Sequence, residues 1–185
     1  MSPLPTSAAT QAYATIAGDH WIETLHDGSH VLIRPLQNDD RERERRFIER
    51  LSPTSRHFRF LAQVRGASAA LLGQLMNVHE PDSCALIALV HDNGELREVG
   101  VSRYSAATEG SCECAVTVAE DWQHRGLGVV LMRHLIAKAR AAGFKTMYSI
   151  DSASNSNMRE LASHLGFTRS LDPDDSAQVI HSLTL

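Results

Sequence analysis

The chain has 185 residues, which is enough for one domain with a sizeable hydrophobic core. Its net charge of −4 gives no general attraction to nucleic acid or to anionic lipid, so we expect neither as a partner. No apolar run approaches the length of a membrane span, and the first residues lack a signal pattern, so we expect a cytoplasmic protein.

Residues 1–18 are rich in Ser, Ala, Thr and Pro without sustained periodicity, which predicts a mobile N-terminal segment. We expect residues 19–185 to form a single domain. Apolar runs at 21–25 and 30–34 flank an Asp-Gly pair, which predicts a first β-hairpin.

Three helices are predicted next. A polar cap within residues 38–40 begins a helix that runs from 41 to 51, and its charged side chains are expected to form a solvated face. The Ser52-Pro53 pair caps and opens a second helix through residues 54–61. A third helix is predicted across 67–76 from its leucine spacing.

A second hairpin is predicted where apolar runs at 85–90 and 98–104 flank an Asp-Asn-Gly-Glu turn. Continuous apolar content in the first run indicates a central strand that is buried on both faces. The β-branched residues that follow predict another strand across 112–118.

The stretch after this strand is expected to carry the chemistry. Leucines recur every fourth residue from 127, which predicts a helix that ends at Gly143. Gly126 and Gly128 remove two β-carbons where that helix begins, so a ligand can approach the backbone. The unpaired amides of the first turn would then hold a phosphate or pyrophosphate. For two glycines alone, however, a structural turn is the stronger interpretation.

Two other nucleotide sites do not fit these residues. A dinucleotide fingerprint needs a third glycine where Leu131 stands, and a P-loop needs Gly-Lys-Ser/Thr at the helix start, which is absent.

The last part of the chain predicts a parallel partner for the strand at 112–118. A strand at 146–150 would complete a right-handed βαβ unit. A capping loop leads into a helix at 158–165 that ends in Gly-Phe, and residues 179–183 are expected to close the sheet as an edge strand.

The three cysteines, Cys84, Cys112 and Cys114, form no disulfide framework, and one Cys-x-Cys pair is weak support for a metal site. We interpret them as buried strand thiols. The ten histidines show no His-Glu-x-x-His pattern. We therefore expect no bound metal.

The Gln123-x-x-Gly126-x-Gly128 spacing after a Val-rich strand resembles the acetyl-coenzyme A motif of the GNAT acetyltransferase superfamily. Segments 34–36 and 51–60 resemble the start of the acetyltransferase domain of bacterial protein lysine acetyltransferases. The resemblance covers about residues 28–185. It implies an α/β (α+β) fold with a mixed, mostly antiparallel twisted sheet, a central parallel βαβ unit, and helices on both faces.

The resemblance also implies acetyl-CoA as the acyl donor and a set of residues that bind it. The strand would meet the pantetheine arm, the Gly-rich loop the pyrophosphate, and an Asn in the last capping loop the arm again. These residues are Val116, Thr117, Val118, Gln123, His124, Arg125, Gly126, Leu127, Gly128, Val129 and Asn155.

Glu113 is the candidate general base, acting directly or through water, because it lies beside the presumed thioester and matches the protein lysine acetyltransferase pattern. An apolar surrounding would desolvate its carboxylate and make it a stronger base. By resemblance, a strand N–H near Val116 would polarise the thioester carbonyl. Many superfamily members carry a tyrosine where this chain has Ala162, which leaves the general acid open between Ser154, Ser156 and water.

The resulting hypothesis is an acetyl-CoA-dependent N-acetyltransferase that transfers acetyl directly to a primary amine, with a protein lysine slightly ahead of a small molecule. The alternative is a non-catalytic acetyl-CoA or CoA-binding sensor module, which Ala162 permits. For Arg56 and Arg59, pairing with the preceding acidic helix is favoured over contact with an acidic substrate or a phosphate. The sequence leaves the oligomeric state open, a homodimer included.

Overall fold

The computed structural model describes residues 18–60, 66–108 and 110–185. The segment predicted to be mobile, residues 1–18, lies outside the described residues except for Gly18. The described residues form one sheet of eight strands in the order β1-β2-β3-β4-β5-β6-β8-β7. The strands are β1 (Trp21–Thr24), β2 (His30–Pro35), β3 (Ser83–Asp92), β4 (Glu95–Ala106), β5 (Ser111–Val118), β6 (Thr146–Ser152), β7 (Thr168–Leu171) and β8 (Gln178–Thr184).

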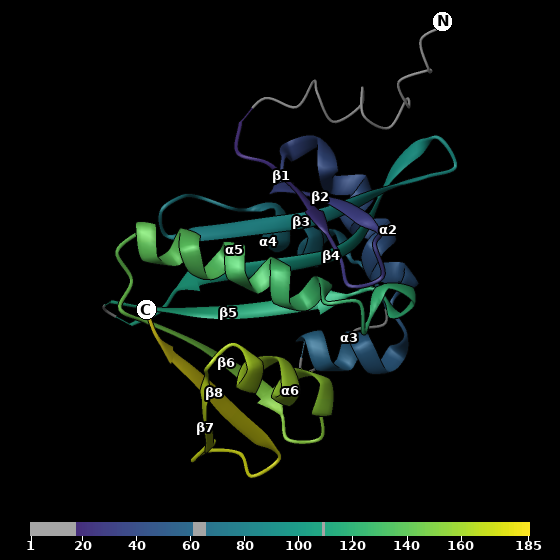
Figure 1. The fold of residues 1–185 in the computed structure, drawn as a ribbon. Coiled ribbons are helices and arrows are strands. Elements are labelled where there is room, and N and C mark those ends of the chain that lie inside the picture. The colour runs from purple at the N-terminus through teal and green to yellow at the C-terminus, as the bar shows by residue number, and fades with distance from the viewer. Residues whose placement is uncertain (1–17, 61–65, 109) are drawn as a thin grey trace, which may run out of the picture.

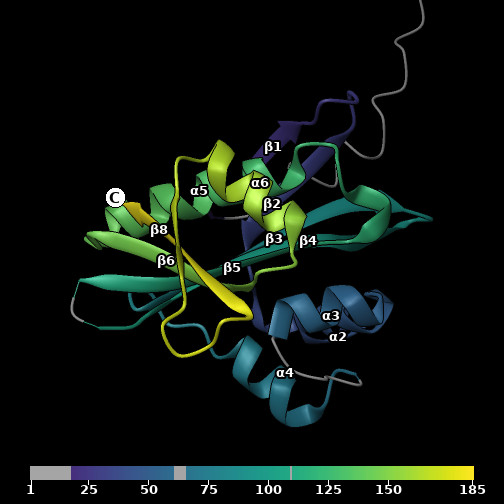
Figure 2. The same ribbon diagram turned by 90° about the horizontal axis from the view of Figure 1, so that it is seen from below.

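Helices cover both faces of this sheet (Figures 1 and 2). In Figure 2, α5 and α6 lie on one face, and α2, α3 and α4 lie on the other. The helices are α2 (Arg41–Arg50), α3 (Pro53–Phe60), α4 (Ala69–Met76), α5 (Leu127–Ala141) and α6 (Ser156–His164). Every strand pair is antiparallel except β5–β6, so the predicted fold class is confirmed.

The core lies between α5 and the central strands. The predicted leucine stripe of α5 is buried, with Leu127, Leu131 and Leu135 at most 1% exposed. Residues 85–89 of β3 are equally buried, as the continuous apolar run predicts. Packing α5 on the sheet this tightly fixes the position of its first turn, which borders the candidate site.

One prediction about the C-terminal strands needs correction, and one strand was not predicted. β8 is not an edge strand, because it lies between β6 and β7 and pairs with both. The edge is β7, which the sequence did not indicate. All four residues of β7 are exposed, so the strand carries no apolar alternation that would reveal it.

The prediction that the first helix turns its charges to solvent is only partly right. Glu44 is 1% exposed and pairs with Arg103 at 2.6 Å. Asp40 is fully buried and does not cap the helix. Its carboxylate instead accepts hydrogen bonds from Arg34 at 2.6 and 2.8 Å. Partners contributed by β2 and β4 therefore bury carboxylates that the local sequence pattern would leave in water.

Within the described residues, no helix combines the length and the apolar content needed to cross a membrane.

Candidate active site

The parallel strands β5 and β6 separate partway along their length. They pair only from Ser111 to Glu113 on β5 and from Thr146 to Tyr148 on β6. β5 continues to Val118, while β6 turns to pair with β8 instead. The divergence leaves one side of β5 without a strand partner beyond Glu113.

The backbone groups that face this gap belong to the even-numbered residues of β5. Flanking hydrogen bonds join Ala107 N to Ser111 O at 3.0 Å and Ala119 N to Val99 O at 2.9 Å. In an antiparallel ladder, bonded and non-bonded pairs alternate, so odd-numbered residues of β5 bond to β4 and even-numbered ones point away. The N–H and C=O groups of Val116 therefore face the gap.

The loop between β5 and α5 has an unusual backbone. Gly126 directly precedes α5 with φ of +88°, and His124 also has a positive φ, of +60°. A β-carbon at Gly126 would lie 2.8 Å from Cε1 of His26, and one at Gly128 would lie 3.3 Å from Cδ2 of Leu161. Backbone conformation therefore favours glycine at Gly126, and close packing against Leu161 favours it at Gly128. The predicted approach of a ligand to these glycines stays a prediction.

Side chains of the loop fix it to its neighbours. Gln123 Nε2 donates to Val118 O at 3.2 Å, which holds the loop against the end of β5. The Arg125 guanidinium donates to Asp27 at 2.9 Å and lies 4.6 Å from the centroid of the Trp122 ring. This anchoring presents the first-turn amides of α5 in a fixed position, where the helix dipole favours an anion.

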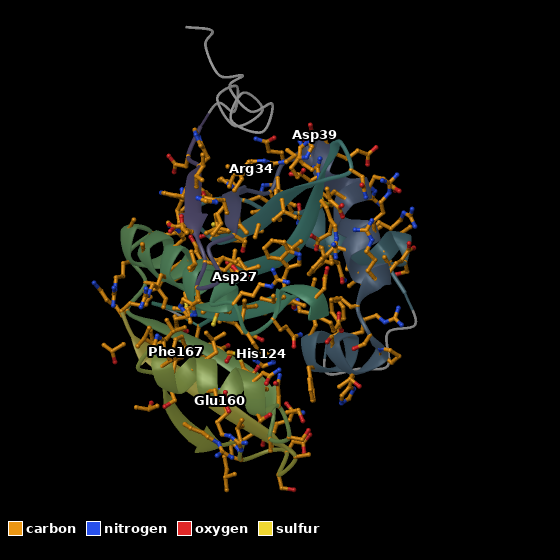
Figure 3. All side chains as sticks on the ribbon, turned by 45° about the vertical axis from the view of Figure 1, so that its right-hand side comes forward. Asp27, Arg34, Asp39, His124, Glu160 and Phe167 are labelled. Carbon is orange, nitrogen blue, oxygen red and sulfur yellow. The ribbon has the colours of Figure 1, made fainter. Side chains whose placement is uncertain are left out.

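A cleft of about 800 Å³ joins the loop to the gap beside β5. It is bordered by α3, β5, the Gly-rich loop, the end of β6, and α6. Figure 3 labels His124 and Glu160, which reach the cleft from the loop and from α6. Of the predicted site residues, those that line it are Glu113, Val116, Thr117, Val118, Gln123, His124, Gly126, Leu127, Gly128, Val129 and Asn155.

Two predicted residues make contacts within the protein: the sequence did not indicate the contact of Arg125, whereas the cap formed by Asn155 agrees with the predicted capping loop. Arg125 is not among the lining residues, because its side chain is turned to Asp27 and Trp122. Asn155 lines the cleft and also caps α6, since its Oδ1 accepts a hydrogen bond from Met158 N at 3.1 Å.

The two faces of β5 look toward different helices. A β-carbon at Gly128 would lie 3.9 Å from Val118, so the even-numbered side chains face α5. Glu113 and Thr117 therefore lie on the opposite face, where α3 packs. The Glu113 side chain is exposed, so the desolvation that we expected from its apolar strand is absent.

The first turn of α3 is held against the loop by Glu120. Its carboxylate accepts a hydrogen bond from Ser52 N at 2.9 Å. Burial alone would raise the pKa of Glu120, but hydrogen bonds from Ser52 and Ser55 hold this pKa below its usual range. Ser52 also caps the helix as predicted, because its Oγ accepts from Ser55 N at 3.1 Å. These hydrogen bonds hold α3 in place, where it forms one wall of the cleft.

Sequence analysis missed a polar group at the far side of the gap. Asp151 at the end of β6 lines the cleft and accepts hydrogen bonds from Ser149 at 2.5 Å and His181 at 2.9 Å. His181 is 2% exposed, and its Nε2 has no hydrogen-bond partner among the described residues. The sequence shows only an aspartate, Asp151, at a strand end. Its partner His181 comes from β8, which is distant along the chain but pairs with β6. Ala162, the usual tyrosine position by resemblance, is 1% exposed.

The cysteines are buried free thiols, as predicted. Burial raises the pKa of Cys112 to about 11, which keeps this thiol protonated at neutral pH. In the part of the chain that the structure describes, no group of three or more His, Cys, Asp or Glu side chains is arranged to hold a metal ion.

Comparison with known proteins identifies relatives of this chain. Residues 65–167 match the family model described as the acetyltransferase (GNAT) family. A Pseudomonas aeruginosa protein named acetyltransferase PA5475 is 59% identical over 186 residues, which span 100% of both chains.

Solved structures agree on the fold. The GNAT domain of S. lividans PAT superposes with a TM-score of 0.82 at 24% identity, covering 90% of this chain and 97% of that one. A cAMP-binding acyltransferase from Mycobacterium smegmatis gives 0.62 at 23% identity, covering 96% of this chain and 50% of that one. At these identities the likeness shows the fold alone.

Proposed function

The chain belongs to the acetyltransferase (GNAT) family, and from this premise we propose that it transfers acetyl directly to a primary amine, a protein lysine ahead of a small molecule. Family membership makes it an N-acetyltransferase with acetyl-CoA as donor. The observation that carries the proposal is the single cleft, which joins the first-turn amides of α5, the unpaired edge of β5, and Glu113.

The chain's own residues fit the proposed donor. The first-turn amides of α5 would hold the pyrophosphate, because they combine unpaired N–H groups with the positive end of the helix dipole. Val116 faces the gap with a free N–H and C=O, which suits main-chain pairing with the amide-containing pantetheine arm. Gln123, His124, Leu127, Val129 and Asn155 complete the predicted contacts from the cleft walls. Arg125 would contribute its backbone only.

Glu113 is proposed to accept the proton of the acceptor amine. When bound, acetyl-CoA supplies a thioester, whose C–S bond breaks as the C–N bond forms and whose thiolate leaves. A lysine amine with a pKa near 10.4 must lose a proton to attack at neutral pH. Because Glu113 is exposed, a water between carboxylate and amine fits this role. The Val116 N–H would polarise the thioester carbonyl, and Ser154, Ser156 or water would protonate the thiolate.

The preference for a protein lysine rests on segment 51–60, which resembles bacterial protein lysine acetyltransferases and forms α3. We also propose that residues 19–185 are a single domain, since one sheet includes strands from Trp21 to Thr184.

Binding of the donor is tested with Gly128→Asp and its uncharged match Gly128→Asn. Acetyl-CoA at about a hundred times its dissociation constant should add roughly 2.7 kcal/mol of stability, seen as a raised thermal midpoint. Gly128→Asp should lose this shift through charge repulsion with the pyrophosphate, while Gly128→Asn should lose less. No shift in the wild type, or an undiminished shift in both variants, would contradict the assignment of the donor to this loop. Equal loss in both variants would contradict only charge repulsion as the cause.

Turnover is tested with Glu113→Gln on a broad amine panel. The variant should keep the acetyl-CoA shift and lose amine acetylation by about 10²- to 10⁴-fold. A wild type that binds acetyl-CoA but acetylates no amine would favour the sensor alternative.

A further inference from the structure

Helix α3 places a cation in the cleft. The Arg59 side chain is half-buried, lines the cleft, and lies with its guanidinium carbon 5.0 Å from the centroid of the Phe60 ring. It forms no ion pair with any described residue, so the pairing with the acidic helix favoured by the sequence does not occur there. A half-buried guanidinium without an anionic partner is costly to keep unless a ligand supplies the partner.

The charges that face Arg59 do not neutralise it. They are Arg103, Glu44 and Glu113. Glu44 and Arg103 pair with each other at 2.6 Å, and among the described residues neither Glu44 nor Glu113 forms an ion pair with Arg59. Burial, together with the Arg103 charge, lowers the pKa of Arg59 to about 10, against the opposing effect of the two carboxylates. The side chain is therefore still a cation at neutral pH.

A second group on the same wall also lacks a partner. Thr117 is 8% exposed and lines the cleft, and its Oγ1 has no hydrogen-bond partner among the described residues. Its side chain lies on the same face of β5 as those of Glu113 and Ala115, because alternate residues of a strand share a face. Buried polar groups are nearly always hydrogen-bonded, so a partner from a bound molecule is expected here.

Of these two groups, Arg59 lies on the acceptor side of the cleft, and Thr117 lies farther along β5 toward the loop. Arg59 and Glu113 both line the cleft and lie close enough for their charges to interact, whereas the loop proposed for the pyrophosphate follows Val118. The five residue steps from Glu113 to Val118 span about 16 Å of strand. A cation near Glu113 is therefore remote from the donor phosphates and close to the proposed acceptor amine.

We propose that the acceptor carries a carboxylate close to its primary amine, and that Arg59 binds this carboxylate while the amine faces Glu113. The inference rests on the proposed function and specifies its substrate class. A guanidinium binds a carboxylate through two parallel hydrogen bonds. Two sources carry this chemistry, an amino acid and a protein lysine next to an acidic residue.

Matched acceptor pairs test the inference and distinguish the sources. One pair is 4-aminobutanoate and 4-aminobutanamide, and the other is a lysine peptide with aspartate or asparagine beside the lysine. The wild type should favour the carboxylate member of at least one pair by about 10- to 100-fold in kcat/KM, the strength of a hydrogen bond to a charged group. Arg59→Gln should bring that ratio to about one. Arg50→Gln is the control, because it removes the same charge from an exposed position at the end of α2.

Binding provides a readout that does not need turnover. Titration of 4-aminobutanoate, or of the aspartate peptide, into the complex with coenzyme A should give binding that Arg59→Gln loses and Arg50→Gln keeps. Acetyl-CoA should raise the thermal midpoint by the same amount in the wild type, in Arg59→Gln and in Arg50→Gln.

Several results would overturn the inference. A wild-type ratio near one in both pairs would remove the carboxylate requirement. If Arg59→Gln lowers kcat/KM equally for both members of a pair, the arginine has a structural role. If it weakens the acetyl-CoA midpoint shift and leaves the ratio unchanged, the arginine binds the donor. If neither pair is acetylated while other amines of the broad panel are, the inference fails and the proposed function stands. If acetyl-CoA binds but no amine of the panel is acetylated, both fail.

Discussion

Replacing Gly126 by alanine tests whether the loop before α5 depends on a left-handed backbone. The φ of +88° is costly for any residue with a β-carbon, by roughly 1–2 kcal/mol. The added methyl group would also lie 2.8 Å from the His26 ring. That ring is exposed and can rotate away, so the backbone conformation should account for most of the cost.

We therefore expect Gly126→Ala to lower the free energy of unfolding by about 1–2 kcal/mol in urea denaturation, or the thermal midpoint by about 2–8 °C. Gly126→Asn should cost less, because asparagine tolerates the left-handed region better. Adding His26→Ala to Gly126→Ala should recover less than about 0.5 kcal/mol. An alanine variant as stable as the wild type, or full recovery by His26→Ala, would refute the argument from backbone conformation.

Three further substitutions follow from two buried carboxylates and one helix cap. Burial and the adjacent Glu44 raise the pKa of Glu98 well above its ordinary value, so the folded state favours the neutral acid and loses stability as pH rises above about 4.5. Glu98→Gln should remove this loss. The difference in the free energy of unfolding between this variant and the wild type, measured in urea, should therefore grow by up to about 1.4 kcal/mol per pH unit. Arg34→Met leaves the Asp40 carboxylate buried without its main partner and should cost about 3–5 kcal/mol at pH 7 by the same assay. Asn155→Ala removes the cap of α6 and should cost about 1 kcal/mol in thermal denaturation.

Each of these has a control. Glu95→Gln makes the same chemical change at an exposed carboxylate, so its effect on the free energy of unfolding should not grow with pH. If the effect of Glu98→Gln were also independent of pH, the argument from a buried acid would be wrong. Arg50→Met should be nearly neutral beside Arg34→Met. Asn155→Ser keeps a capping oxygen and should recover most of the stability lost in the alanine variant.

Much of the candidate site was predictable because it depends on local pattern. Leucine periodicity located α5, the Gly126 and Gly128 spacing located its first turn, and β-branched residues located β5. These signals lie within a few residues of the features that they specify, so a single sequence carries them. The predicted list therefore lines one cleft, apart from Arg125.

Features missed by the sequence depend on partners that are distant along the chain. The burial of Glu44 requires Arg103, and the polar group at Asp151 requires His181, which comes from β8. The position of β8 between β6 and β7 depends on which strands meet, and short polar strands do not encode that choice.

By itself, the sequence determined the order and type of most elements, the family resemblance, and the residues around the Gly-rich loop. Only the tertiary structure decided that β5 and β6 part after Glu113, that this carboxylate is exposed, and that Arg59 lies in the cleft. The physical reason is that periodicity and turn chemistry act between neighbours in the chain, whereas strand separation and side-chain burial depend on residues brought together only by folding.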